Sequence, residues 1–101
     1  MRGLTLPQDI SAYVSRHFAP SEQISVLKLL GSALQPGGEP ADAHMLRCAL
    51  AISGGKLANL QFDIDWMASD CRDVIVNAEF GRRDGAWVQL RDLSQPFSPS
   101  D

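Results

Sequence analysis

The chain is poor in several features that would narrow its function. It has only two cysteines and a 7% aromatic content, and nine basic residues stand against twelve acidic ones, for a formal net charge of −3. Two cysteines cannot supply a disulfide framework, and no window approaches the roughly 20 apolar residues of a membrane span. Basic residues cluster only at Arg82–Arg83, with Arg91 farther on. This argues against nucleic acid or an anionic membrane surface as a partner.

The first nine residues also lack the features of a signal peptide. Pro7 and Asp9 interrupt the segment before an apolar run of the required length can form. We therefore expect a cytoplasmic protein in which Cys48 and Cys71 stay reduced. Each cysteine lies within an apolar pattern, where a free thiol behaves as a small hydrophobic side chain.

The 101 residues and the 45% hydrophobic content fit one globular domain. We predict a single helical domain over residues 1–94 and a flexible tail over 95–101, which is rich in proline and serine. Charge divides unevenly along the chain. Residues 1–50 carry four positive and four negative side chains, whereas residues 51–101 carry five positive and eight negative. The negative charge is concentrated between Asp63 and Glu79.

Apolar residues three and four positions apart predict two helices in the first third of the chain. The first covers about 8–18 and follows Pro7. The second begins with Ser21 as its N-cap, and we expect it to lie in the middle of the bundle because it is the most apolar. Its inward stripe is predicted to comprise Ile24, Leu27, Leu30 and Leu34, widened by Val26 and Leu29.

A third helix is predicted over about 42–53, capped by Asp42 and stopped by Gly54–Gly55. The segment 56–80 continues the same apolar spacing throughout. Either one kinked helix or two helices would satisfy it, and we favour a break at Ser69–Asp70 because both residues are good N-caps.

The sequence after residue 80 completes the predicted fold. Alternating residues around Asp84–Gly85 are typical of a short hairpin. The fold class is therefore all-α, a small orthogonal bundle of four to five short helices with an irregular or β-hairpin C-terminal segment. The predicted core comprises Val14, Ile24, Leu27, Leu30, Leu46, Leu50, Leu57, Leu60, Ile64, Met67 and Val74.

Two histidines and two cysteines are the residues with the clearest potential for metal or nucleophilic chemistry. His44 and Cys48 are four residues apart, so they share a helix face, but zinc sites usually need four ligands. The other donors, His17 and Cys71, lie on separate helices, and no ligand motif is formed. We therefore predict no metal, no cofactor and no catalytic residue.

An enzymatic or ligand-binding alternative stays open. It would use His44, Cys48 or Cys71 beside the acidic stretch over residues 63–79. Against it, Asp70 and Asp73 flank Cys71, and negative neighbours raise the pKa of a thiol. The acidic stretch itself lacks the spacing of an EF-hand loop and is interpreted as a solvated face.

Phe62 and Trp66 give the strongest functional signal. On a helical wheel they fall opposite the predicted core stripe, adjacent to each other and flanked by polar residues. Exposed aromatic pairs of this kind are typical of interfaces, and Trp87 is a candidate for the same surface. The main hypothesis is a non-enzymatic interaction module, either self-associating as a homodimer or serving as an adaptor. The alternative is that the first helix or the C-terminal segment buries the two rings.

Residues 46–80 resemble a group of small uncharacterised bacterial helical proteins. The resemblance rests on four short matches, namely Leu46-Arg47-Cys48, Ser53-Gly54-Gly55-Lys56-Leu57 with Leu60, Ser69-Asp70-Cys71-Arg72-Asp73-Val74, and Ala78-Glu79-Phe80. The sequence departs from that pattern at Lys56, where an acidic cap is expected. The group has no assigned activity, so the resemblance implies helices with a break at Asp70. It also implies a buried or half-buried pairing that involves Arg72-Asp73.

Overall fold

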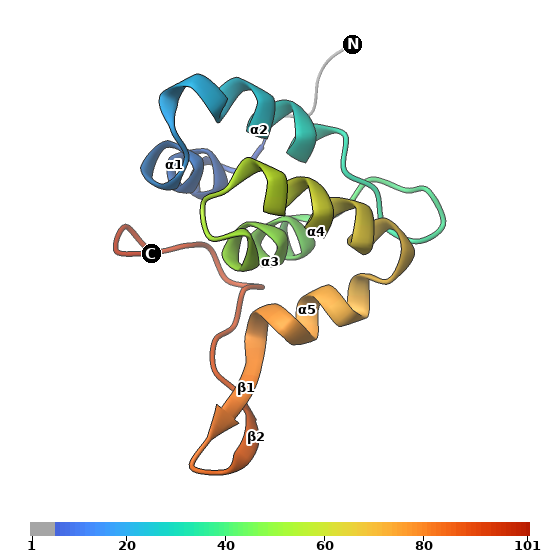
Figure 1. The fold of residues 1–101 in the computed structure, drawn as a ribbon, viewed down its shortest axis with the longest axis vertical. Helices are drawn as coiled ribbons and strands as arrows, with labels where there is room; N and C mark the ends of the chain where they lie inside the picture. Colours follow the sequence, from blue (N-terminus) through green and yellow to red (C-terminus); the bar gives the residue numbers. More distant parts are fainter. Residues whose placement is uncertain (1–5) are drawn as a thin grey trace.

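Five α-helices, one 3-10 turn and a β-hairpin form the regular structure of residues 6–101, the part of the chain that the computed structural model describes (Figure 1). The chain is mostly helical and ends in a short antiparallel hairpin, as predicted. That the helices cross at near right angles stays a prediction. In chain order the elements are α1 (Gln8–His17), η1 (Pro20–Glu22), α2 (Gln23–Gly31), α3 (Ala43–Ser53), α4 (Leu57–Ser69), α5 (Cys71–Glu79), β1 (Phe80–Arg83) and β2 (Ala86–Gln89).

Aspartate caps set two of the helix starts, as the sequence predicts. Asp42 accepts a hydrogen bond from the backbone N–H of Met45 at 2.9 Å, and Asp70 accepts one from that of Asp73 at 3.2 Å. Each bond satisfies a donor that has no partner within its own helix. The break at Asp70 is therefore confirmed, and α4 and α5 are separate helices.

The turn between α3 and α4 requires glycine for two reasons. Gly54 ends α3 in the left-handed region, at φ 66°, and Gly55 follows at φ 76°. A Cβ atom on Gly55 would also lie 2.5 Å from the carbonyl oxygen of His17. The missing side chain thus lets the end of α1 rest directly on this turn.

The predicted start of the second helix is wrong by one residue. Ser21 lies inside the 3-10 turn η1, and α2 begins at Gln23 with no side-chain cap. Pro20 explains the difference, because its fixed φ and missing N–H suit the first position of a helical turn.

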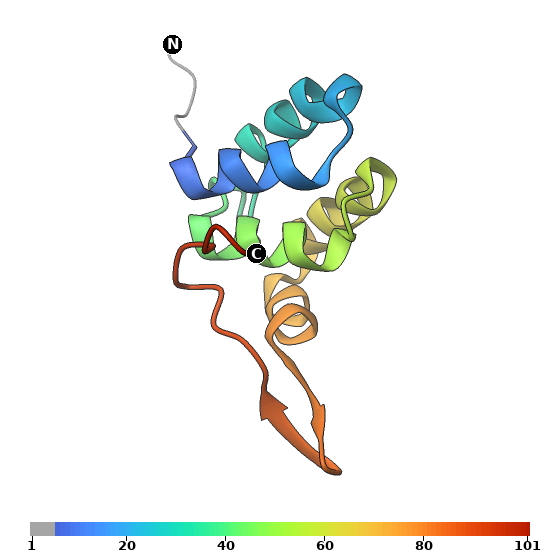
Figure 2. The same ribbon diagram turned by 90° about the vertical axis from the view of Figure 1, so that its left-hand side faces the viewer.

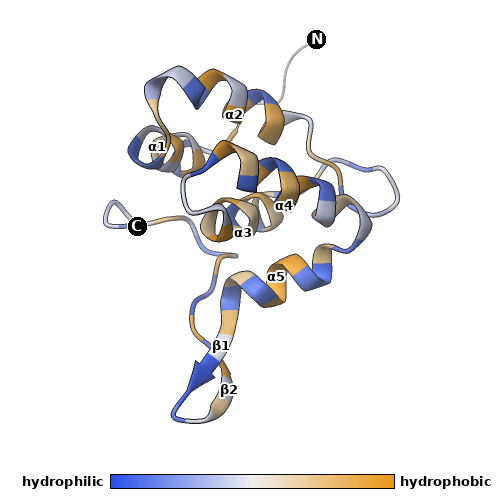
Figure 3. Cartoon of the chain, in the orientation of Figure 1, coloured by the Kyte–Doolittle hydropathy of each residue, from blue (hydrophilic) through white to orange (hydrophobic). Residues whose placement is uncertain are grey.

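The inward face of α2 also differs from the prediction. Val26 and Leu30 are buried, whereas Ile24 is 70% exposed, and Leu27 and Leu34 are exposed as well. Apolar residues recur along α2 (Figure 3), and the exposure of Ile24 and Leu27 shows that they do not mark one face alone. The buried face is therefore narrower than the apolar sequence suggests.

The central helix is α3, not α2 as predicted. It packs against both α4 and α5, and the C-terminal segment lies along it (Figures 1 and 2). Most predicted core residues are buried, namely Val14, Leu30, Leu46, Leu50, Leu60, Ile64, Met67 and Val74. Leu57 is half-buried. The core also includes residues that the prediction omitted, among them Ile10 and Phe18 near the start of the chain and Leu93 and Phe97 near its end.

The hairpin projects away from the helices (Figure 2). Its antiparallel register pairs Phe80 with Gln89 and Arg83 with Ala86. The turn residues Asp84 and Gly85 both have positive φ, at 53° and 80°. This is the backbone of a type I′ turn, which the Asp–Gly dipeptide favours, so the predicted hairpin is confirmed.

After β2 the chain returns to α1 without regular secondary structure. Phe97 is buried and stacks on Tyr13, with ring centroids 4.1 Å apart. The Arg16 side chain donates hydrogen bonds to the carbonyl oxygens of Ser98 and Asp101. The C-terminal residues therefore make specific contacts with α1, while their flexibility stays a prediction.

Two further expectations can be compared with the structure. Arg72 and Asp73 are both exposed, so the expected buried pairing does not form there. Among the described residues, no helix is long and apolar enough to cross a membrane.

Candidate functional site

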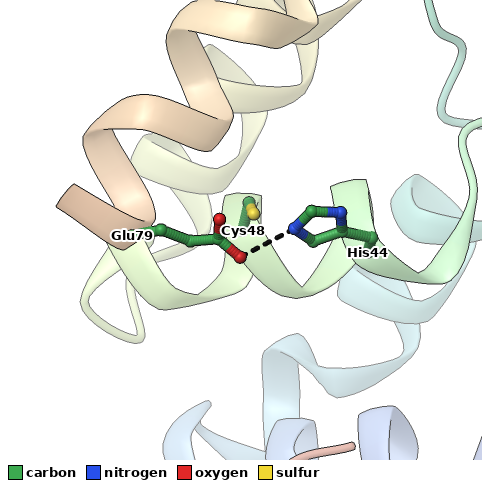
Figure 4. Close-up of side chains that lie close together, drawn as sticks. All are labelled: His44, Cys48 and Glu79. Carbon is green, nitrogen blue, oxygen red and sulfur yellow. Dashed lines mark hydrogen bonds and ion pairs between the residues drawn. The ribbon is translucent and has the colours of Figure 1, made fainter. Parts of the chain in front are cut away.

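One side-chain cluster joins α3 to the end of α5. His44 and Cys48 lie one turn apart on α3, and Glu79, the last residue of α5, faces both of them (Figure 4). His44 Nε2 is 2.7 Å from Glu79 Oε2. One ligand atom from each of the three residues lies within 4.8 Å of the other two. We call this set the His-Cys-Glu cluster.

Glu79 is almost completely buried, and its carboxylate is held from several sides. Besides the bond with His44, Oε2 accepts a hydrogen bond from the Leu93 N–H at 2.7 Å, and Oε1 accepts one from Gln89 Nε2 at 3.4 Å. Buried carboxylates are stable only when they are paired in this way. The carboxylate is thus fixed in position, and it anchors the returning chain at residue 93.

The thiol of Cys48 has no solvent exposure. Burial first, and then the carboxylates of Glu79 and Asp42, raise its pKa to about 12. The thiolate is the nucleophilic form, so this cysteine is a weak nucleophile at neutral pH. Cys71 begins α5 and Glu79 ends it, which separates the two by roughly 12 Å along the helix. The structure therefore brings together His44 and Cys48 but leaves Cys71 outside the cluster.

Glu79 is the member of the cluster that the sequence did not identify. It was assigned to a solvated acidic stretch, and no helical periodicity marks it as buried. Its burial comes from residues 89–93, which return past the end of α5 after the hairpin. A contact between segments separated by a turn leaves no signal in local sequence.

An ion pair between buried Arg47 and half-buried Asp9 fixes the chain around residue 93 from another side. Arg47 donates to Asp9 at 2.9 Å and also to the carbonyl oxygens of Leu93 and Ser94. Asp9 in turn accepts the N–H of Phe97. Burial alone would raise the pKa of Asp9, but the hydrogen bonds from Arg47 and Phe97 outweigh it and lower that pKa. This pair has a structural role, because its hydrogen bonds join α1, α3 and the C-terminal segment.

A second candidate site lies on the outer face of α4. Phe62 is 66% exposed and Trp66 is half-buried, with ring centroids 6.2 Å apart. Together with Asp65 they line an apolar hollow of about 340 Å³. The Asp65 carboxylate accepts a hydrogen bond from Gln61 at 3.2 Å. We call Phe62, Asp65 and Trp66 the aromatic surface.

Two of the three predicted interface residues lie together on α4, and the third lies elsewhere. Phe62 and Trp66 form the aromatic surface, and the exposure of Phe62 excludes the alternative that other segments bury both rings. Trp87 is 59% exposed on β2 and does not line the hollow. It lies instead on the projecting hairpin (Figure 1).

A second acidic residue, after Glu79, departs from the predicted solvated face. Asp63 is only 6% exposed, and within residues 6–101 its Oδ2 atom has no hydrogen-bond partner. Burial raises the pKa of this carboxyl group to about 6. Asp63 is therefore a destabilising group near neutral pH, because its charged form is desolvated.

Comparisons with known proteins give no match. No family model fits the chain, and no curated protein or solved structure is significantly similar to it. The resemblance to uncharacterised bacterial proteins therefore stays a prediction, and function must be argued from the geometry.

Proposed function

We propose that this chain is a non-enzymatic protein-interaction module that self-associates through the aromatic surface. The observation that carries the proposal is the exposure of Phe62, 66% of which faces solvent on a well-packed helix. Aromatic side chains supply much of the binding energy at interfaces, and tryptophan is the most enriched of them. Phe62 beside Trp66 provides such a pair together with a hollow that a ring can enter.

The chemistry of the surface favours a second copy as the partner. The hollow is apolar and is lined mainly by the two rings, and the Asp65 carboxylate beside them is held by a hydrogen bond from Gln61. We expect this carboxylate to stay hydrated at the rim of the interface. An aromatic pair is complementary to another aromatic pair in offset or edge-to-face geometry. A twofold dimer places the same patch on both sides of one interface, which suits this self-complementary surface.

The expected association is weak. The hollow involves three residues on a single helix, so the buried area falls at the lower end of known interfaces. We expect a dimer in rapid exchange with monomer, with a dissociation constant on the order of 10 μM to 1 mM.

Sedimentation velocity over a wide concentration range tests the proposal. The wild-type protein should show a mass that rises with concentration toward twice that of the monomer. Phe62→Ala should keep the fold, because the side chain is largely exposed, and should shift the protein to monomer at all concentrations. Trp87→Ala is the matched control, since it removes a similarly exposed aromatic side chain outside the hollow and should leave self-association unchanged.

Two results would overturn the proposal. One is a wild-type protein that stays monomeric at the highest concentration. The other is a dimer that Trp87→Ala dissociates while Phe62→Ala does not, which would move the interface to the hairpin. The enzymatic alternative gains little support, because the Cys48 thiol is buried and its pKa is about 12.

A further inference from the structure

The geometry of the His-Cys-Glu cluster points to a binding site for a divalent zinc-class metal ion, and we propose that His44, Cys48 and Glu79 are its three protein ligands. The site is separate from the aromatic surface, since it lies between α3 and α5 and not on α4. It therefore does not depend on self-association.

The donor set matches the preferences of zinc. Thiolate, imidazole and carboxylate are the three ligand types that zinc accepts in proteins. Their atoms already lie within 4.8 Å of one another. Tetrahedral coordination, with bonds of about 2.0–2.3 Å, needs ligand atoms roughly 3.2–3.8 Å apart. The 2.7 Å between His44 Nε2 and Glu79 Oε2 would have to widen by roughly 0.5 Å, so the ion would replace the hydrogen bond between them. A separation near 4.8 Å would have to shorten by about 1 Å, and both changes are within the reach of side-chain rotation.

The fold places all three ligands together before any ion binds. The spacing of four residues puts His44 and Cys48 on the same face of α3. The Glu79 carboxylate is oriented by hydrogen bonds from Leu93 and Gln89. Partners of this kind, behind the ligands themselves, raise metal affinity by fixing ligand geometry.

Access and charge also suit a cation. The His44 side chain is 31% exposed, whereas that of Glu79 is only 5% exposed, so the site opens to solvent on its histidine side. A fourth position there can be taken by water, as in zinc sites with three protein ligands. On binding, the Cys48 thiol transfers its proton to solvent, and the sulfur forms the metal bond as thiolate.

Cobalt(II) provides the direct test because it occupies zinc sites and its thiolate complexes absorb in the near ultraviolet. Wild-type protein titrated with Co²⁺ should show a sulfur-to-cobalt charge-transfer band that saturates at one equivalent, and added Zn²⁺ should remove it. Cys48→Ala should abolish this band. His44→Gln should weaken Co²⁺ binding by at least about a hundredfold, since even groups behind the ligands are worth 10- to 100-fold.

The chain offers a matched control for each variant. Cys71→Ala removes the other cysteine, and His17→Gln removes the other histidine, so both should titrate like the wild type. Circular dichroism establishes that each variant is folded. If Cys48→Ala does not fold, the comparison of His44→Gln with His17→Gln still tests the metal site. His44→Gln should fold, because the His44 side chain is partly exposed.

The proposal is overturned if wild-type protein gives no charge-transfer band at millimolar Co²⁺. It is equally overturned if the band survives in Cys48→Ala but disappears in Cys71→Ala. Neither result bears on self-association, which is read from the sedimentation of Phe62→Ala and not from metal binding.

Discussion

Helices α2 and α3 carry similar apolar patterns but reach opposite degrees of burial. By mean hydropathy α2 is the more apolar of the two, yet only two of its nine residues, Val26 and Leu30, are buried. In α3, seven of eleven residues are buried, including the polar residues Arg47 and Ser53. Mean hydropathy therefore does not decide which helix occupies the centre.

The difference follows from how many sides of each helix are covered. Other helices contact α3 on two sides and the C-terminal segment lies along it, whereas α2 packs on one flank of the bundle (Figure 2). The buried polar residues of α3 are tolerated because each has a partner. Arg47 bonds to Asp9, and the Ser53 hydroxyl donates to the Leu50 carbonyl at 2.7 Å.

The largest expected effect comes from breaking the ion pair of the central helix. Arg47→Met should lower the free energy of unfolding by about 3–5 kcal/mol, because it leaves the half-buried carboxylate of Asp9 and the carbonyl oxygens of Leu93 and Ser94 without their partner. Urea unfolding measures the change. The double variant Asp9→Leu/Arg47→Met should lose less than Arg47→Met alone, since no charge stays unpaired. A double variant with a lower free energy of unfolding than Arg47→Met would contradict this explanation.

The second prediction compares one leucine from each helix. Leu50→Ala in α3 should cost about 2–5 kcal/mol of unfolding free energy, because the side chain has no solvent exposure and its removal leaves a cavity. Leu27→Ala in α2 should cost less than about 1 kcal/mol, because the side chain is 36% exposed. Thermal or urea unfolding distinguishes them. Equal losses would show that α2 is as central as its composition suggests.

The third prediction concerns a buried polar group that lacks the partners found in α3. The pKa of Asp63 rises from 3.8 to about 6 on folding. The folded protein thus holds this proton more tightly, so Asp63 reduces stability as pH rises from about 4 through 6. Relative to wild type, Asp63→Asn should be about 1–3 kcal/mol more stabilising at pH 7 than at pH 4.

Urea unfolding at the two pH values measures this difference. The control is Asp65→Asn, an exposed carboxylate two residues away, which should change stability little at either pH. Any constant cost of burying the asparagine amide cancels in the comparison. An Asp63→Asn effect that is the same at pH 4 and pH 7 would show that the carboxyl group does not titrate as the burial implies.

Much of the fold was predictable because its determinants are local. Asp42 and Asp70 cap helices through bonds to residues three positions later, and Asp84–Gly85 selects its turn by backbone preference alone. The exposed face of α2 was not predictable, because it depends on which side the neighbouring helices cover. The core contributions of Leu93 and Phe97 depend in the same way on the return of the chain.

The same distinction between local and long-range contacts applies to the candidate sites. Phe62 and Trp66 belong to one helix, so a helical wheel predicts their adjacency, which the structure confirms. Glu79 joins His44 from another helix, 35 positions along the chain, and no local pattern could pair them. Trp87 was grouped with the aromatic pair by residue type only, and the hairpin carries it elsewhere.

The contacts of Asp9 bear on how this chain is made. Its partners are Arg47 and the N–H of Phe97, so the first helix is synthesised long before the groups that fix it. On the ribosome, α3 to α5 can assemble from neighbouring segments, while α1 receives its last contacts only when residue 97 leaves the exit tunnel. Arg47 becomes available to Asp9 once α3 has been synthesised, and the Phe97 N–H only later. The contacts of α1 are therefore completed after those among α3, α4 and α5, although α1 precedes these helices in the chain.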